Sequence, residues 1–262
     1  MKLSIIILNY RTRGLLRQCL RGIYHFPPTV EFEVIVVDNN SGDGSEIMVR
    51  DEFRDVRFVA LPSNVGYPRG NNAGLKLARG ANCLFLNTDV VVAAGQIDAL
   101  CNYLDANPRI GAAGPRLVNA DGTLQNSAFR FYRILTPLYH RTLLGQTNRG
   151  KKELIRFTYA DWDHRSSRSV AWLMSSCLLV RRIALNDAGF FDERFFIYLA
   201  DTDLCRRLWL NGWEVHYVAT VDFIHYHRRQ SVEDFRLTAI HALDWLKFLW
   251  KWRGHKLPAA GD

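Results

Sequence analysis

Three short segments carry pairs of polar side chains of the kind that bind a divalent metal ion. They are Asn87-Thr88-Asp89, Asp161-Trp162-Asp163 and Asp201-Thr202-Asp203. Carboxylate oxygens bind Mg²⁺ or Mn²⁺ and leave coordination positions open for phosphate. Only the first triplet directly follows an apolar run, at 83–86, which predicts a buried strand. We therefore expect Asp89 at the edge of a sheet, whereas Asp161 and Asp163 lie in a polar, basic stretch and should be solvated.

The third triplet and a histidine pair each allow two interpretations. Asp201 and Asp203 open a predicted helix over 201–210, where carboxylates also serve as simple caps. His225 and His227 flank one residue, so on a strand both would point to the same face. There they could bind a metal ion or phosphate, or be two ordinary surface histidines.

The segment 64–74 contains glycines at Gly66, Gly70 and Gly74 and leads into a helix predicted to begin at about Asn71. A glycine-rich approach to a helix N-terminus suits a phosphate group. The alternative is a tight turn. No Gly-Lys-Ser/Thr follows and the preceding strand is wrongly spaced, so neither the P-loop nor the dinucleotide fingerprint is present.

The elements that would position these residues alternate along the first half of the chain. Apolar runs at 3–8, 32–37, 56–61 and 82–86 predict strands, with helices at 15–24 and from 71. This order indicates a mostly parallel sheet covered on both faces, with ligands at the carboxyl ends of its strands. Further along, we expect loops and short strands at 115–132, a mobile loop at 140–169, ordered structure at 170–180 and a strand at 213–217.

Together these segments resemble the family-2 glycosyltransferases with the GT-A fold. The resemblance covers residues 3 to about 231, and within the family it is greatest to the rhamnosyltransferase-type branch. It is carried by segments 4–10, 36–45, 64–74, 84–89, 189–198, 201–206 and 211–213. It implies an α/β, Rossmann-like, mostly parallel central sheet with helices on both faces, forming one domain over 1–231.

The resemblance also implies roles for individual residues. Asp201 matches the catalytic base, Asp89 the last carboxylate of the metal motif, and His225 or His227 a histidine near the metal and diphosphate. The residues implied on the nucleotide side are Asn9, Tyr10, Asp38, Asn40, Asn64, Arg69, Asn71, Asn87 and Thr88. Those implied on the acceptor side are Trp172, Asp192, Glu193 and Asp203.

The implied reaction is an inverting, metal-dependent sugar transfer with Mg²⁺ or Mn²⁺ as cofactor. The resemblance favours dTDP-rhamnose as donor, with UDP-sugars next, and a saccharide or lipid-linked saccharide acceptor in cell-surface polysaccharide synthesis. Four positions depart from the family pattern: Asn87 stands for the usual Asp, Ala200 for Glu, and Ser175-Ser176 for Gly-Ala. Ala200 leaves the base itself in place.

Two other functions share parts of this pattern. A sugar nucleotidyltransferase would need a glycine-rich first loop, which residues 9–14 lack. A non-catalytic scaffold that binds nucleotide-sugars at a membrane surface would make Ala200 a mark of lost activity. Incubation with sugar nucleotides would separate these from a transferase.

The composition narrows the partners and the compartment. The 262 residues carry a net charge of +8, which suggests a polyanionic partner. The basic residues are dispersed and form no nucleic-acid motif, so we expect no nucleic-acid partner. Five widely spaced cysteines predict reduced thiols. The N-terminal apolar stretch is too short for a signal peptide, and no run is long enough to span a bilayer. We therefore expect a cytoplasmic protein, free or peripheral on the cytoplasmic face of the membrane.

The C-terminal residues 232–262 predict a separate helical extension. Residues 231–234 resemble a capping box, and residues 235–252 have leucines at helical spacing together with three of the seven tryptophans. Tryptophans with Lys or Arg on an amphipathic helix fit an interfacial membrane anchor. The alternative is a helix packed on its own domain or on the second subunit of a homodimer.

Overall fold

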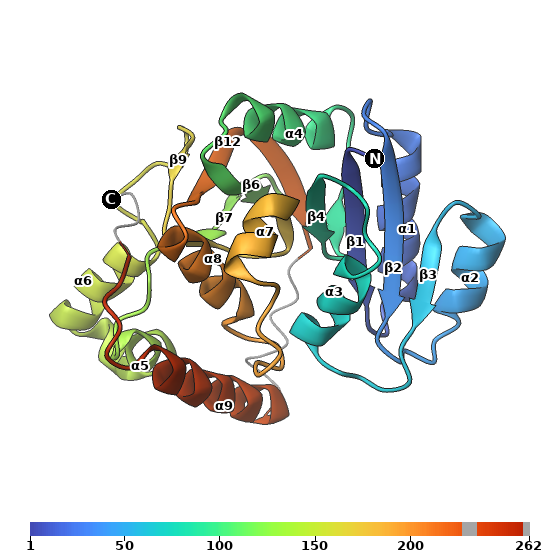
Figure 1. Cartoon of the computed structure of the whole chain (residues 1–262). Coiled ribbons are helices and arrows are strands. Elements are labelled where there is room, and N and C mark those ends of the chain that lie inside the picture. Colours follow the sequence, from blue (N-terminus) through green and yellow to red (C-terminus); the bar gives the residue numbers. More distant parts are fainter. Residues whose placement is uncertain (227–234, 259–262) are drawn as a thin grey trace.

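The computed structural model describes residues 1–226 and 235–258, so His227 and the predicted capping box lie outside the described residues. Within them, the alternation of strands and helices predicted for the first half is confirmed (Figure 1). Its elements are β1 (Leu3–Asn9), α1 (Arg13–His25), β2 (Phe32–Asp38), α2 (Ser45–Glu52), β3 (Arg57–Ala60), α3 (Tyr67–Leu75) and β4 (Asn82–Leu86).

The second half completes the sheet and adds helices outside it. Its strands are β5 (Val90–Val91), β6 (Ile110–Val118), β7 (Leu124–Gln125), β8 (Ala128–Phe129), β9 (Arg168–Ser169), β10 (Trp172–Leu173), β11 (Cys177–Arg181) and β12 (Glu214–His225). Its helices are α4 (Gln96–Ala106), α5 (Thr136–Arg141), the short η1 (Leu143–Gln146), α6 (Asn148–Phe157), α7 (Arg182–Ala188), α8 (Ala200–Leu210) and α9 (Phe235–Trp252).

The main sheet has the strand order β3-β2-β1-β4-β11-β6-β12-β5. Strands β3, β2, β1 and β4 are parallel, and so are β6 and β12. Strand β11 runs antiparallel to both of its neighbours, β4 and β6. The sheet is therefore mixed but mostly parallel, and the ends of β1, β2 and β4 lie at one edge.

Both faces of the sheet are covered, as the continuous apolar strands predicted. Ile5 and Ile7 of β1 belong to a core with residues of α1, α2 and α4. Ile6, one residue between them, belongs to the core on the other face with residues of α3, α7 and α8. The two-residue period of a strand explains this division. All five cysteines are buried and none forms a disulfide.

Helix α3 begins at Tyr67, four residues before the start predicted at Asn71. Pro68 lies in its first turn, a position that favours proline. A Cβ on Gly70 would lie 2.4 Å from Leu8 Cδ1, and one on Gly74 would lie 2.7 Å from Ile6 Cγ2. These two glycines thus let the helix pack directly on β1, so their spacing reflects helix–sheet packing.

The prediction of a mobile loop at 140–169 is wrong. This stretch contains η1, α6 and β9, and the Thr147 side chain caps α6 by accepting from the Gly150 N–H. Phe157 and Tyr159 are buried and anchor it to the core. The many basic residues misled the prediction because they occupy the outer surface of a packed helix. Asp161 is paired with Arg130 at 3.1 Å.

Helix α9 packs on its own domain along one face (Figure 1). Phe248 is 5% exposed, and Trp245 and Trp252 pack against the same core. The opposite face exposes Leu243, Leu246 and Trp250. In residues 1–226 and 235–258, no helix is both long enough and apolar enough to cross a bilayer.

Candidate functional site

The ends of β1 and β2 hold a buried cluster of polar side chains. Asn9 Nδ2 donates to Asp38 Oδ1 at 2.7 Å and lies 3.0 Å from the hydroxyls of both Ser41 and Ser45. Asp38 Oδ2 accepts from the Ser41 N–H at 2.8 Å. Asn9 is fully buried and Asp38 is 8% exposed. The two residues predicted on the nucleotide side thus hold each other at the edge of the sheet.

Asn39 joins this cluster to the loop before α3. Its Nδ2 donates to Asn64 Oδ1 at 2.8 Å, and its Oδ1 accepts from the Val65 N–H at 2.8 Å. Asn64 Oδ1 also accepts from the Gly66 N–H. The sequence placed Asn39 in the polar cluster but assigned it no role. The sequence feature that could have indicated Asn39 is its position directly after Asp38.

The other residues predicted on the nucleotide side are spread around this cluster. Tyr10 and Asn40 are exposed, and Asn40 has a positive φ of 60°. The Arg69 guanidinium pairs with Glu193 at 3.6 Å on the surface. Asn71 is buried within α3, where its side chain donates to the Tyr67 carbonyl. Tyr10, Asn40 and Arg69 are therefore the members of this set that reach solvent.

The segment 87–89 connects the cluster to the end of β12. Thr88 Oγ1 lies 2.9 Å from Thr12 Oγ1, which donates to Asn9 Oδ1. Asp89 Oδ1 lies 3.2 Å from His225 Nε2, within the distance of an ion pair. This contact is not a hydrogen bond, and Asp89 Oδ1 has no hydrogen-bond partner among the described residues.

His225 is oriented from its other ring nitrogen. His225 Nδ1 lies 2.6 Å from Gln125 Oε1, an acceptor, so Nδ1 carries the proton. In the neutral ring, Nε2 is then the unprotonated nitrogen, and it lies 3.2 Å from Asp89 Oδ1. An imidazole nitrogen and a carboxylate oxygen this close together can be ligands of one cation. The sequence predicted both residues, and Gln125 was missed because it lies 100 residues from its partner.

A cavity of about 370 Å³ lies beside this segment, and Asp201 and Asn87 both line it. Asp201 is the second residue of α8, and its Oδ1 accepts from the Thr202 N–H at 2.8 Å. Burial raises the pKa of Asp201 from 3.8 to about 6, although backbone hydrogen bonds from Thr202 and Ser175 lower it. A carboxylate with this pKa can take a proton from a hydroxyl near neutral pH.

Aromatic rings form much of the wall of this cavity. Trp172 stacks on Phe129 with 4.6 Å between ring centroids, and Tyr132 lies 5.8 Å from Trp172 in a stacked arrangement. The Trp172 indole N–H donates to the Arg130 carbonyl, which holds the ring in place. Rigid aromatic surfaces beside a carboxylate suit a sugar ring, which has apolar faces and polar edges.

Tyr67 lines the same cavity as Asp201 and was not predicted. Its hydroxyl donates to the Ser175 carbonyl at 3.1 Å. Burial raises the pKa of Tyr67, and the charges of Asp201 and Asp89 raise it further. Asp89 itself lines a neighbouring cavity of about 300 Å³ together with Thr88.

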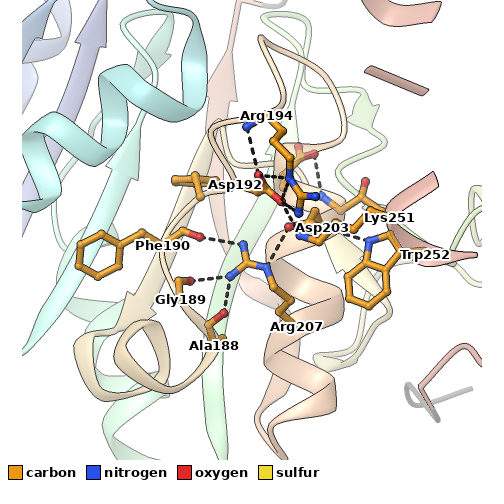
Figure 2. A network of polar contacts seen from close by, with 12 residues as sticks. Ala188, Gly189, Phe190, Asp192, Arg194, Asp203, Arg207, Lys251 and Trp252 are labelled. Carbon is orange, nitrogen blue, oxygen red and sulfur yellow. Dashed lines mark hydrogen bonds and ion pairs between the residues drawn. The ribbon is translucent and has the colours of Figure 1, made fainter. Parts of the chain in front are cut away.

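The residues predicted on the acceptor side occupy two places. Trp172 lines the cavity, whereas Asp192 and Asp203 lie in an ion network outside its lining (Figure 2). Lys251 of α9 pairs with both of these carboxylates at 2.6 Å. Burial alone would raise the pKa of Asp192, but hydrogen bonds from Arg194 and Lys251 lower it well below its ordinary value.

The same network fastens α8 to its surroundings. Asp203 is fully buried and accepts from the Arg207 guanidinium at 2.9 Å and the Trp252 indole at 2.9 Å. Figure 2 shows Arg207 reaching the backbone carbonyls at 188–190. The network thus joins α8, α9 and the loop between α7 and α8.

Comparison with known proteins gives concordant results. The sequence pattern of the family described as "Glycosyl transferase family 2" matches residues 4–169. An N-acetylglucosaminyl-diphospho-decaprenol L-rhamnosyltransferase of Mycobacterium tuberculosis is 32% identical over 215 residues, 77% of this chain and 68% of that protein. Rhamnosyltransferase WbbL of Escherichia coli is 26% identical over 145 residues, 55% of this chain and 51% of its own length.

The fold has counterparts among solved structures. The mannosyltransferase PcManGT from Pyrobaculum calidifontis, solved with GDP-Man and Mn²⁺, matches with a TM-score of 0.66 at 18% identity. The match covers 98% of this chain and 66% of that one. This likeness confirms the predicted GT-A fold.

Proposed function

The chain belongs to glycosyl transferase family 2, and we propose that it transfers rhamnose from dTDP-rhamnose to a lipid-linked saccharide in cell-surface polysaccharide synthesis. It is a glycosyltransferase of the rhamnosyltransferase-like branch. The observation that carries the proposal is the placement of Asp201, whose pKa is raised to about 6, in an aromatic cavity next to the 87–89 segment. The printed activity of the M. tuberculosis relative supports the donor sugar and the acceptor class.

The proposed chemistry is a single displacement. An acceptor hydroxyl attacks the anomeric carbon of the donor while Asp201 removes the hydroxyl proton. The bond between that carbon and the diphosphate oxygen breaks with its electron pair, so the nucleotide diphosphate leaves. Attack from the opposite face inverts the anomeric configuration, and no covalent enzyme intermediate is required.

Asp89 and His225 are proposed to hold a divalent cation. The fit rests on the buried Asp89 Oδ1 without a hydrogen-bond partner among the described residues and on the His225 Nε2 only 3.2 Å from it. Two protein ligands are enough for an ion that also binds substrate phosphates. A bound Mg²⁺ or Mn²⁺ would neutralise charge on the leaving diphosphate.

Asp38 and Asn9 are proposed to bind the nucleotide base and ribose. Each Asp38 oxygen accepts one hydrogen bond within the protein and retains capacity for a second. A carboxylate here can accept from the N3–H of thymine or uracil. Guanine also presents a donor there, its N1–H, so the choice of dTDP or UDP over GDP is supported by the similarity to a rhamnosyltransferase and not by this hydrogen bond.

The acceptor is proposed to meet the enzyme at a membrane surface. The outer face of α9 exposes Leu243, Leu246 and Trp250 next to Lys247 and Arg253. Exposed tryptophan and leucine beside cations fit the boundary of an anionic bilayer. A homodimer through the same face is the alternative, and light scattering with and without lipid vesicles separates the two.

The test is transfer from dTDP-rhamnose to a synthetic N-acetylglucosaminyl-diphospho-lipid with Mg²⁺ or Mn²⁺, followed by mass spectrometry. We expect product that contains one added deoxyhexose and none with the Asp201→Asn variant. A thermal-shift screen with dTDP, UDP and GDP accompanies it. Stabilisation by GDP alone would refute the role of Asp38, and transfer only from a different sugar nucleotide would refute the proposed donor.

Two other functions make different predictions in the same assays. A sugar nucleotidyltransferase would form a sugar nucleotide from a sugar phosphate and a nucleoside triphosphate. A non-catalytic scaffold would bind dTDP but neither transfer nor slowly hydrolyse the donor. The family membership favours the transferase over both.

A further inference from the structure

A second cavity, larger than the one at Asp201, lies between α5, α6 and α9. Its volume is about 1200 Å³, and its surface is mostly apolar, with Leu135, Phe248 and Leu249 in the walls. Arg133, Arg149, Lys152 and Arg253 also line it. Its acidic residue, Glu153, is neutralised by Arg133 at 3.2 Å and Arg156 at 2.7 Å. The cavity therefore combines apolar walls with an excess of positive charge.

A buried cation lies in this cavity. Arg206 of α8 lines it and is only 3% exposed. Its Nη2 donates to the carbonyls of His255 and Lys256, both at 3.1 Å, and its guanidinium lies 4.0 Å from the Trp252 ring centroid. Its Nε has no hydrogen-bond partner among the described residues.

No carboxylate of residues 1–226 and 235–258 lies within ion-pair distance of Arg206. The neighbouring Asp203 is engaged by Arg207 and Lys251 instead. Burial accordingly lowers the pKa of Arg206 to about 10. A buried charge without a counter-charge is costly, so an anion that reaches this guanidinium would be stabilised by charge pairing.

This cavity adjoins the one that contains Asp201. Tyr132 lines both of them, with its ring stacked toward Trp172 on one side and 5.4 Å from Trp245 on the other. Asp201 and Arg206 lie on the same helix, five residues apart, which is about 7.5 Å along the axis and about 140° around it, so they face the two cavities from different sides of α8. The wall formed by Tyr132 is therefore what the two cavities share.

We propose that this second cavity binds the lipid part of the acceptor, with its apolar chain between α5, α6 and α9 and its diphosphate on Arg206. The inference rests on the proposed function and extends it to a binding site for a single anionic amphiphile. Arg206 is recessed rather than exposed on the surface, so the phosphates of an intact bilayer do not reach it. A single lipid molecule that leaves the bilayer and enters the cavity does reach Arg206.

The test is direct binding of farnesyl diphosphate, followed by tryptophan fluorescence, since Trp245 and Trp252 line the cavity. Saturating dTDP and Mg²⁺ keep the probe out of the donor site. We expect farnesyl diphosphate to bind at least tenfold more tightly than inorganic pyrophosphate, which lacks the chain, or farnesol, which lacks the charge. Phosphatidylglycerol vesicles, the bilayer control, should not displace it.

Variants at two cavity residues, Arg206 and Leu135, and a control variant locate the probe. Arg206→Gln should weaken farnesyl diphosphate binding at least tenfold, and Arg206→Lys should retain more of it. Leu135→Glu, at a position that is 51% exposed and so tolerant of charge, should repel the chain without disturbing the fold. Arg165→Gln removes an exposed cation that lines neither cavity and should leave binding unchanged. Circular dichroism checks that each variant is folded.

The results distinguish this inference from the proposed function. Equal binding by the wild type and both cavity variants, equal affinity for pyrophosphate and farnesyl diphosphate, or displacement by vesicles would overturn the lipid site. Sugar transfer could still be observed in each of those cases. Conversely, tight and Arg206-dependent binding without any sugar transfer would support the lipid site and refute the proposed reaction.

Discussion

Replacing Asp201 with asparagine should abolish most turnover and at the same time make the protein more stable at neutral pH. The loss of a positioned general base typically costs about 10²–10⁴-fold in rate. The gain in stability has a separate origin. Burial raises the pKa of this carboxyl from 3.8 to about 6, so at pH 7 the folded protein holds a charge that its surroundings disfavour. Asparagine has the same shape, is neutral at every pH and can still accept from the Thr202 N–H.

The size and pH range of the gain follow from the two pKa values. The difference corresponds to about 3 kcal/mol of unfolding free energy, since one pKa unit is worth about 1.4 kcal/mol. The side chain is only partly buried and opens onto a cavity, so we expect roughly 1–3 kcal/mol. Below pH 3.8 the carboxyl is protonated in both the folded and the unfolded protein, so its burial costs no stability. The wild type loses unfolding free energy as the pH rises from 3.8 through 6, because the folded carboxyl must then ionise. The unfolding free energy of the variant should therefore exceed that of the wild type above pH 6 and match it near pH 4.

The assay is thermal and urea unfolding of both proteins from pH 4 to pH 8, together with the kcat of sugar transfer. Asp163→Asn is the matched control, because Asp163 is exposed and its change should show no such pH dependence. The wild-type kcat should also fall as the pH drops below about 6. If the stability advantage of Asp201→Asn over the wild type is no larger at pH 8 than at pH 4, the burial argument is refuted. Near-normal turnover by the variant would refute the role of Asp201 as base.

Three further variants test the parts around this carboxylate. Gly66→Ala should lower the unfolding free energy by about 1–3 kcal/mol and weaken dTDP binding in calorimetry, because Gly66 has a φ of +84° and its Cβ would lie 2.3 Å from the Phe196 carbonyl oxygen. Asp244→Asn should lower kcat several-fold with little change in the KM for donor, because the buried Asp244 carboxylate accepts hydrogen bonds from the backbone N–H groups of residues 196–198. His225→Gln should raise the Mn²⁺ concentration for half-maximal activity about 10–100-fold.

Each of these three variants has a matched control variant. Gly95→Ala has a similar φ of +71° but open space around the new Cβ, so it isolates the backbone cost from the clash. Lys247→Ala removes the exposed partner of Asp244 and should change kcat little. His216→Gln changes a histidine that binds Tyr103 and Glu214 away from the site. A control with the same effect as its test variant would contradict the corresponding argument.

The sequence predicted most clearly what depends on local pattern. Apolar runs located the strands of the first half. Because parallel strands end at one edge of a sheet, the sequence alone predicts that Asn9, Asp38 and Asp89 lie at the same edge. The predicted start of α3 at Asn71 is four residues late because Gly66 and Gly70 suggest a loop up to that point, and Gly74 lies within the helix. Gly70 and Gly74 pack on β1 instead, a tertiary contact that no local pattern reports.

What could not be predicted depends on contacts between distant residues. Gln125, which orients His225, lies 100 residues from its partner, and the contact of Asn39 with Asn64 in the 64–66 loop spans 25 residues. The fold of 140–169 depends on two buried aromatic side chains, Phe157 and Tyr159, within a basic stretch. Such anchors are visible only once the surface they pack against is known.

The C-terminal helix supports the loop before the proposed base, Asp201, in a way that its sequence does not suggest. Asp244 of α9 is fully buried, and its carboxylate accepts from the backbone N–H groups of Phe196, Ile197 and Tyr198 at 3.0–3.1 Å. These residues directly precede Leu199, a non-glycine residue with a φ of +65°, a strained backbone conformation.

The strained residue is two positions before Asp201, so the loop must be held for the base to face the cavity. Asp244 supplies that restraint from the helix that Lys251 and Trp252 also fasten to α8. Deleting residues 235–262 should therefore abolish transfer even to a water-soluble acceptor, for which a membrane anchor is not needed. Full transfer to such an acceptor by a folded, truncated chain would show that the helix serves only as an anchor.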